Sequence, residues 1–359
     1  MARLPATITG LALTCMGSLT WANDTFVHES AGNLMFVQNN EVAIAKERLV
    51  IGPAKRGGPG ALGWTIPIHV EYELKSLSAK TVKAGIGFPL APCVLTNYLA
   101  EKTTNFVSGS AATCVKEPRM TLKAGGRTIV GKWGFVFLRD GAPLGTSPAE
   151  VGLSKRLGAL IDLVGDPDKK YFVEDPVFLK AATELCGEFR GEMKGPECQA
   201  FDRILVHRTY LWDYTFPAGS TVQVVHDYSV NASWNLHPET VFPFDAFCLS
   251  DPVMRTTWKN YREENARQVT AAINGVYKGV DEYPYPQEFF TEYVLRTGAL
   301  WAGPIKDFEL VIRKSSPKEL ISTCFSGLTK SSAVEFKVHK TNFKPEEDLR
   351  VLFLRPAGK

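Results

Sequence analysis

The chain has 359 residues, enough for two domains that each bury a core, and its 45% hydrophobic and 22% charged content is typical of a globular protein. The formal net charge is only +3, and the charges are spread along the chain without a long run of like sign. This distribution argues against a nucleic-acid-binding protein and provides no basic block that would attract an anionic membrane.

The first predicted element is a signal peptide over residues 1–22. Arg3 precedes a mostly apolar run, and Ala22 supplies a small residue at a plausible cleavage point. The run is shorter than the roughly 20 apolar residues that span a bilayer. We therefore expect a mature chain that begins near Asn23, has no transmembrane segment, and is periplasmic or secreted.

The cysteines fit the same export prediction. Removal of the leader would leave an even number of them and no C-x-x-C motif, so we expect disulfides rather than a metal site. Sequence alone leaves many connectivities open, but loop geometry favours three pairs. These are Cys93–Cys114, Cys186–Cys198 and Cys248–Cys324.

The mature chain begins with a predicted N-terminal β domain, residues 23–145. The segment 65–74 alternates, with apolar residues from Ile66 to Leu74 at even positions and the polar residues Thr65, His69, Glu71 and Glu73 at odd positions. That alternation predicts a strand with one buried face and one wet face, and it places His69 on the wet face.

Residues 146–200 predict a helical insert, because Ser147, Pro148 and Glu150 form a capping box before an apolar helical stripe. Residues 201–359 predict a C-terminal β domain that contains one long helix, 251–274. The predicted fold class is therefore mainly β, with two β-sandwich-like regions, a helical insert and one long helix.

The stretch 211–230 reads as two strands joined by the turn "FPAGS" in a hairpin. His226 falls in the inward phase, whereas Asp213 and Asp227 fall on the opposite face and cannot easily orient its ring. We interpret His226 as a structural residue. The alternative is a pocket histidine that acts as a general base or a ligand.

One segment, 281–301, is a candidate for ligand binding because it concentrates aromatic side chains among acidic residues and prolines. Aromatic platforms suit sugar rings or a protein groove, although the same side chains could simply fill a core. The candidate residues are Tyr283, Tyr285, Phe290, Tyr293 and Trp301.

Several segments together resemble a family of exported bacterial proteins known only as a domain of unknown function. They are "SAGNLMFVQNNEVAIAKERLVIG", "IHVEYELKSLSAKTVKAGIGFPL", "LWDYTFPAGSTVQVVHDYSV", "LWAGPIKDFELVI" and "NFKPEEDLRVLFL". The resemblance implies an exported Gram-negative protein with β-sandwich-like parts, and it implies no activity. The segment ending in Phe88-Pro89-Leu90 also resembles the start of the vault/inter-alpha-trypsin type of β-sandwich, whose domains are structural or adhesive.

No compact catalytic motif is found in the sequence. We therefore expect a non-enzymatic protein of the cell envelope that binds a partner protein or a glycan through a β-sheet surface or the aromatic segment. No cofactor is expected. The alternative is a cell-wall or ester hydrolase whose nucleophile lies outside any recognisable motif.

Overall fold

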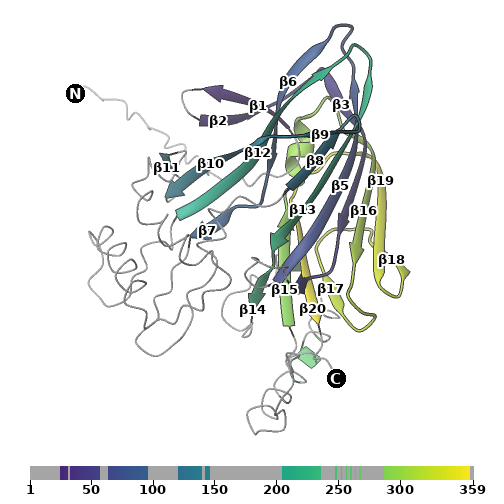
Figure 1. Cartoon of the computed structure of the whole chain (residues 1–359). Coiled ribbons are helices and arrows are strands. Elements are labelled where there is room, and N and C mark those ends of the chain that lie inside the picture. The colour runs from purple at the N-terminus through teal and green to yellow at the C-terminus, as the bar shows by residue number, and fades with distance from the viewer. Residues whose placement is uncertain are drawn as a thin grey trace, which may run out of the picture.

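The computed structural model describes residues 25–30, 33–56, 64–95, 120–139, 142–145, 204–235, 247–248, 252, 256, 259–260, 263, 267 and 287–355. Strands dominate this part of the chain and form three sheets (Figure 1). We name them the large sheet, the middle sheet and the small sheet.

The large sheet has nine strands in the order β18-β19-β16-β3-β5-β13-β8-β9, with β4 paired to β5 outside this path. Its strands are mostly antiparallel, but β3 and β16 pair in parallel, with Arg48 opposite Glu309. The bounds are β3 (Val42–Ile51), β4 (Lys55–Arg56), β5 (Trp64–Ser76), β8 (Met120–Ala124), β9 (Arg127–Ile129), β13 (Thr221–Asn231), β16 (Ile305–Arg313), β18 (Thr329–Ser332) and β19 (Glu335–Phe343).

The middle sheet has seven strands in the order β11-β10-β12-β6-β1-β2, and β7 pairs with β12 beside them. All of its pairings are antiparallel. The bounds are β1 (Thr25–Ser30), β2 (Asn33–Val37), β6 (Val82–Pro89), β7 (Cys93–Leu95), β10 (Lys132–Arg139), β11 (Ala142–Gly145) and β12 (Ile204–Phe216).

The small sheet has four antiparallel strands in the order β14-β15-β20-β17. A short 3-10 helix, η2 (Arg296–Leu300), follows β15. The bounds of the strands are β14 (Ser233–Asn235), β15 (Gln287–Tyr293), β17 (Leu320–Ser322) and β20 (Leu349–Arg355).

A single apolar core joins the three sheets. One continuous cluster of buried residues includes Val70 of β5, Phe88 of β6, Trp212 of β12 and Phe353 of β20. The inner face of the large sheet supplies much of it, because the apolar phase of β5 alternates with polar residues as the sequence predicts. The other two sheets cover that face with aromatic side chains.

The predicted fold class is correct in being mainly β but is otherwise wrong. Strands from both predicted β regions alternate within the large sheet, for example β5 beside β13, so the sheets do not form two separate sandwich-like regions. The part of the chain that the structure describes contains no α-helical element and has η2 as its helix. The arrangement could not be predicted from local patterns, because strand pairing depends on residues that are far apart in the chain, as in the pairing of β5 with β13.

The two predicted helical segments lie wholly or mostly outside the residues that the structure describes. The insert 146–200 lies outside the described residues, as does most of 251–274, where isolated positions such as Thr256 and Glu263 have helical backbone geometry. No helix among the described residues is long and apolar enough to cross a membrane.

The predicted hairpin at "FPAGS" is also wrong in its pairing. Residues 217–220 do connect two strands, but β12 pairs with β10, β6 and β7, whereas β13 pairs with β5 and β8. The turn therefore carries the chain from the middle sheet to the large sheet. Both strands have inward apolar side chains, which face each other across the core instead of lying side by side.

Candidate functional site

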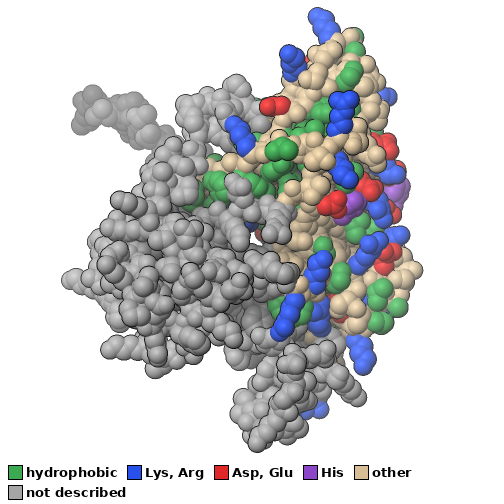
Figure 2. Space-filling model, viewed as in Figure 1, with side chains coloured by type: hydrophobic (Ala, Val, Ile, Leu, Met, Phe, Trp, Pro, Cys, Tyr) green, Lys and Arg blue, Asp and Glu red, His purple; other side chains and the backbone are tan. Residues whose placement is uncertain are grey.

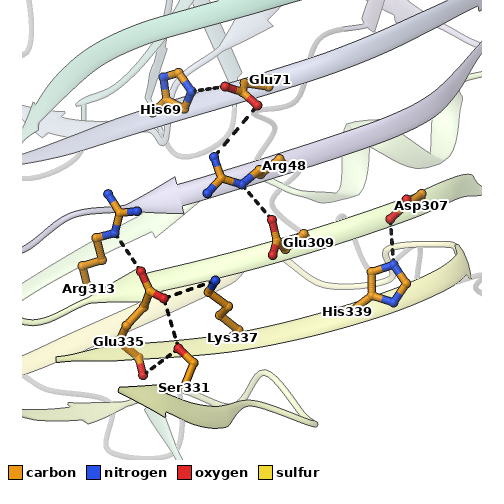
Figure 3. Close-up of polar contacts among 10 residues, drawn as sticks. All are labelled: Arg48, His69, Glu71, Asp307, Glu309, Arg313, Ser331, Glu335, Lys337 and His339. Atoms are coloured by element: carbon orange, nitrogen blue, oxygen red, sulfur yellow. Dashed lines mark hydrogen bonds and ion pairs between the residues drawn. The ribbon is translucent and has the colours of Figure 1, made fainter. Parts of the chain in front are cut away.

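The outer face of the large sheet carries a row of charged side chains across four adjacent strands. We call the row the charged belt and define it as Asp227, His69, Glu71, Arg48 and Glu309. These residues lie on β13, β5, β3 and β16, and each is at least partly exposed to solvent. Figure 3 shows most of the belt lying along one face of the ribbon.

Arg48 lies at the centre of the belt, between two glutamates. Its Nε donates to Glu309 Oε2 at 2.7 Å, and its Nη1 lies 3.9 Å from Glu71 Oε2. The register explains both contacts, because Arg48 is directly opposite Glu71 on β5 and Glu309 on β16. The side chains of Arg48 and Glu309 are each 29% exposed, so the pair is partly shielded from water.

His69 continues the belt and is held at both ring nitrogens. Nδ1 lies 2.6 Å from Asp227 Oδ1, and Nε2 lies 2.9 Å from Glu71 Oε1. Burial lowers the pKa of His69, but the hydrogen bonds and negative charges of Asp227 and Glu71 outweigh it, and the pKa rises above its ordinary value of 6.5. A protonated imidazole, which donates from both nitrogens, fits this position.

Two further polar groups lie on the same face (Figure 3). His339 Nε2 lies 2.7 Å from Asp307 Oδ1. Arg313 donates to Glu335 at 3.0 Å, and Lys337 lies 3.3 Å from the same carboxylate. The hydrogen bond from Arg313 is the main reason that the pKa of Glu335 is lowered. The face therefore presents fixed charges of both signs, as Figure 2 shows along the right side of the molecule.

This arrangement is suited to binding rather than to acid–base catalysis. A general base that activates a nucleophile needs one ring nitrogen for the nucleophile, and carboxylates occupy both nitrogens of His69. In the described part of the chain, no group of three or more His, Cys, Asp or Glu side chains could hold a metal ion. What the belt offers is a set of charged groups already held in place.

His226 lies on the inner face, as its phase predicts, and is completely buried. Its ring stacks on Phe88 with centroids 4.6 Å apart and meets Tyr72 edge-on at 5.8 Å. Asp227, the next residue, points outward and contacts His69 instead. The surroundings of His226 are those of a core residue, in line with the structural interpretation.

The structure separates the predicted aromatic ligand site into different environments. Tyr293 and Trp301 are each only 1% exposed and belong to the core, where Tyr293 Oη lies 3.2 Å from Tyr72 Oη. Phe290 is half-buried and meets Phe247 edge-on. Tyr283 and Tyr285 lie outside the described residues. Because two of the five residues are not described, ligand binding by this segment stays a prediction.

Of the cysteine pairs, the structure describes one. Cys248 and Cys324 form a disulfide with a Cα–Cα distance of 5.1 Å, and this pairing confirms the prediction from loop geometry. Ser322 Oγ also donates to the carbonyl oxygen of Phe247 beside the bridge. The side chains of Cys93, Cys114, Cys186 and Cys198 lie outside the described residues.

The charged belt was not anticipated from the sequence, although part of its signal was visible. Period-2 alternation placed His69 and Glu71 on a wet face, and both lie there. The partners come from strands far apart in the chain, since Arg48 and Glu309 are 261 residues apart. Only the register of β3 against β5 and β16 brings these charges together.

Fold and surface together define a mainly β protein whose described sheets share one core and present a broad charged face. The model of the family described as "Domain of unknown function (DUF4424)" matches residues 22–112 and 184–352, more than half of the chain. The chain belongs to this family. No curated protein matches it.

Similarity to solved structures is distant. A "putative nutrient binding protein" from Legionella pneumophila aligns over 93% of this chain and 72% of its own, with 14% identity and a TM-score of 0.43. An M1 zinc metallopeptidase from Deinococcus radiodurans, bound to a Tyr-Ser-Ala substrate, aligns over 89% of this chain and 44% of its own, with 7% identity and a TM-score of 0.27. The resemblance to the vault/inter-alpha-trypsin type gains no support from these matches.

Proposed function

We propose that this protein is a non-enzymatic binding protein of the cell envelope that recognises a partner through the outer face of the large sheet. The observation that carries the proposal is the charged belt, in which five side chains from four strands are linked by ion pairs on a solvent-facing surface. Side chains that are already fixed lose little rotamer freedom when a partner docks on them, which favours specific binding.

The sheet face is a better candidate for the binding surface than the aromatic segment 281–301. Both surfaces are predicted from the sequence as candidates, but Tyr293 and Trp301 of the aromatic segment are buried in the core and are not accessible to a partner. The partner we propose is an envelope protein or a glycan with polar and charged groups. Its complementary charges would pair with Arg48, His69 and the surrounding carboxylates.

Export to the periplasm or beyond is part of the same proposal. The leader-like residues 1–22 support it, and so does the Cys248–Cys324 disulfide, because such bonds persist mainly in oxidising compartments. The N-terminal sequence of the mature protein should begin near Asn23. Recovery of only the form that begins at Met1, from the cytoplasm, would contradict export.

The binding proposal is tested by exchanging the charges of one belt pair. The double variant Arg48→Glu/Glu309→Arg keeps an ion pair but reverses the pattern, so in-cell crosslinking should capture at least about tenfold less partner, a loss of about 1.4 kcal/mol in binding. The matched control is Arg350→Glu/Glu292→Arg, which exchanges an Arg–Glu pair at 3.0 Å on the small sheet.

Thermal denaturation of both variants separates binding from folding. If the belt variant is as stable as the control and captures the same crosslinked partner in the same amount as the wild type, the belt is not the binding surface.

A further inference from the structure

Lysines that are distant in sequence gather at one end of the molecule. The turns at residues 77–81 and 217–220 each pass between the large and middle sheets, and they lie together at the upper end of the view in Figure 1. Two backbone hydrogen bonds tie them: Ser76 N donates to the Ser220 carbonyl at 2.8 Å, and Gly219 N donates to the Ser78 carbonyl at 3.2 Å. We call these two turns and their flanking residues the tip.

Three exposed lysines lie at the tip. Lys75 lies between buried Leu74 and Ser76 and so projects from the large sheet, and Lys83 lies between buried Val82 and Ala84 on the middle sheet. Lys80 lies in the turn between them, where its backbone NH donates to Ser78 Oγ. None of the three has an ion-pair partner among the described residues. Figure 2 shows Lys and Arg side chains projecting around this end.

The tip also carries an exposed leucine. Leu77 is 55% exposed, and among the described residues it is one of two large hydrophobic side chains that are so accessible. Its backbone NH donates to the Glu41 carbonyl, which fixes its position at the start of the turn. The neighbouring turn adds exposed Pro217 and Ala218. An apolar side chain surrounded by lysines is the arrangement that inserts into a lipid interface.

We infer that the tip docks on an anionic phospholipid surface. The lysines would contact the lipid phosphates while Leu77 enters the boundary between headgroups and acyl chains. The acidic side chains nearby are few: Glu41 lies beside the turn, and Glu73 and Asp213 lie further along their strands. The inference does not depend on the charged belt, because the tip lies at an end of the sheet and the belt crosses its middle.

The test is sedimentation of the purified mature chain with vesicles, either phosphatidylcholine alone or phosphatidylcholine with 30% phosphatidylglycerol. We expect binding to the anionic vesicles, weakened by raised salt because the surface potential is screened. Each lysine near an anionic surface contributes about a fivefold increase in partitioning, so Lys75→Gln/Lys80→Gln/Lys83→Gln should bind about 100-fold less. Leu77→Ser should lose about tenfold.

The matched control is Lys55→Gln/Lys318→Gln/Lys330→Gln, which removes three exposed lysines near the other end of the large sheet. It should bind as the wild type does, within about twofold of the same partition coefficient, since those lysines lie far from the docked end. Equal binding to neutral and anionic vesicles would overturn the inference. So would an equal loss in the two triple variants, because the attraction would then reflect net charge and not the tip.

Discussion

At the scale of single residues, two histidines on neighbouring strands of the large sheet have opposite surroundings. His69 on the outer face is bracketed by carboxylates, whereas His226 on the inner face is surrounded by aromatic rings. In the pairing of β13 with β5, Asp227 is opposite His69 and His226 is opposite Val70. Because successive side chains of a strand point to opposite faces of the sheet, His226 points inward, whereas Asp227 and His69 point outward. Each histidine leads to a different prediction.

The first prediction concerns the pH dependence contributed by His69. Its pKa is raised in the folded protein, so its stabilisation is fully present below the ordinary value of 6.5 and is lost as the pH rises through the folded value. His69→Gln should therefore lower the free energy of unfolding more at about pH 5.5 than at about pH 8.5. Because the side chain is partly exposed, we expect a difference below about 1 kcal/mol.

Urea denaturation of the wild type and the variant at both pH values measures this difference. A cost of His69→Gln that is the same at the two pH values, or larger at the higher one, would mean that Asp227 and Glu71 do not hold a protonated ring.

The second prediction concerns packing around His226. His226→Gln replaces a buried ring that stacks on Phe88 with a flexible polar chain, and we expect it to lower the free energy of unfolding by about 2 to 4 kcal/mol. His226→Phe keeps an aromatic ring there and should cost less. The measurement is chemical denaturation, with partner capture as the second readout. A Gln variant that is fully stable but no longer captures the partner would make His226 a functional residue.

At the scale of elements, local patterns predicted individual strands well. The alternation in 65–74 became β5, and the two strand patterns in 211–230 became parts of β12 and β13. The position of each strand in a sheet could not be predicted in this way, because pairing depends on residues far away in the chain. The β12–β13 turn illustrates the limit: its residues indicate a turn but do not say that it changes sheets.

The candidate site could likewise be predicted only in part, because its residues are brought together by strand pairing. Sequence placed His69 on a wet face, but the belt exists only because β3 pairs with β5 on one side and with β16 on the other. No local pattern in "AKERLV" indicates that Arg48 would lie between two glutamates. The tip has the same origin, since Lys75, Lys80 and Lys83 meet the 217–220 turn only through the connection between two sheets.

The third prediction concerns the disulfide that joins Cys324, just after β17, to Cys248, which lies between β14 and β15 in the chain. Cys248 and Cys324 are 76 residues apart, and closing a loop of that size stabilises the fold by about 4 kcal/mol in the chain-entropy model. Cys248→Ser, Cys324→Ser and the double variant should all lose about this much stability, because each removes the same bond. Equilibrium denaturation of the three oxidised proteins provides the comparison.

Alkylation followed by non-reducing peptide mapping provides the independent check. If Cys248 is freely alkylated in oxidised, exported protein, the two cysteines are not paired.

At the scale of the whole molecule, the core that the three described sheets share predicts that they form one cooperative unit. Residues of all three sheets belong to one buried cluster, including Trp212 of the middle sheet and Trp301 after η2. Loss of any sheet would expose the apolar face of another, so we expect the described sheets to unfold together. Far-UV circular dichroism and tryptophan fluorescence should give coincident denaturation curves. Two separated transitions would instead indicate domains that unfold independently.

The parallel pairing of β3 with β16 also constrains the order in which the protein can fold. β3 is made early and has β5 on one side, but its other neighbour is not available until residues 305–313 have emerged. During vectorial synthesis or passage across a membrane, β3 is therefore left with a free backbone edge next to apolar side chains, a combination that is prone to aggregation. Pairing over so great a separation makes closure of the sheet a late and slow event. A chaperone that protects nascent strand edges should consequently raise the yield of native protein, and a chain truncated before residue 305 should accumulate as aggregate.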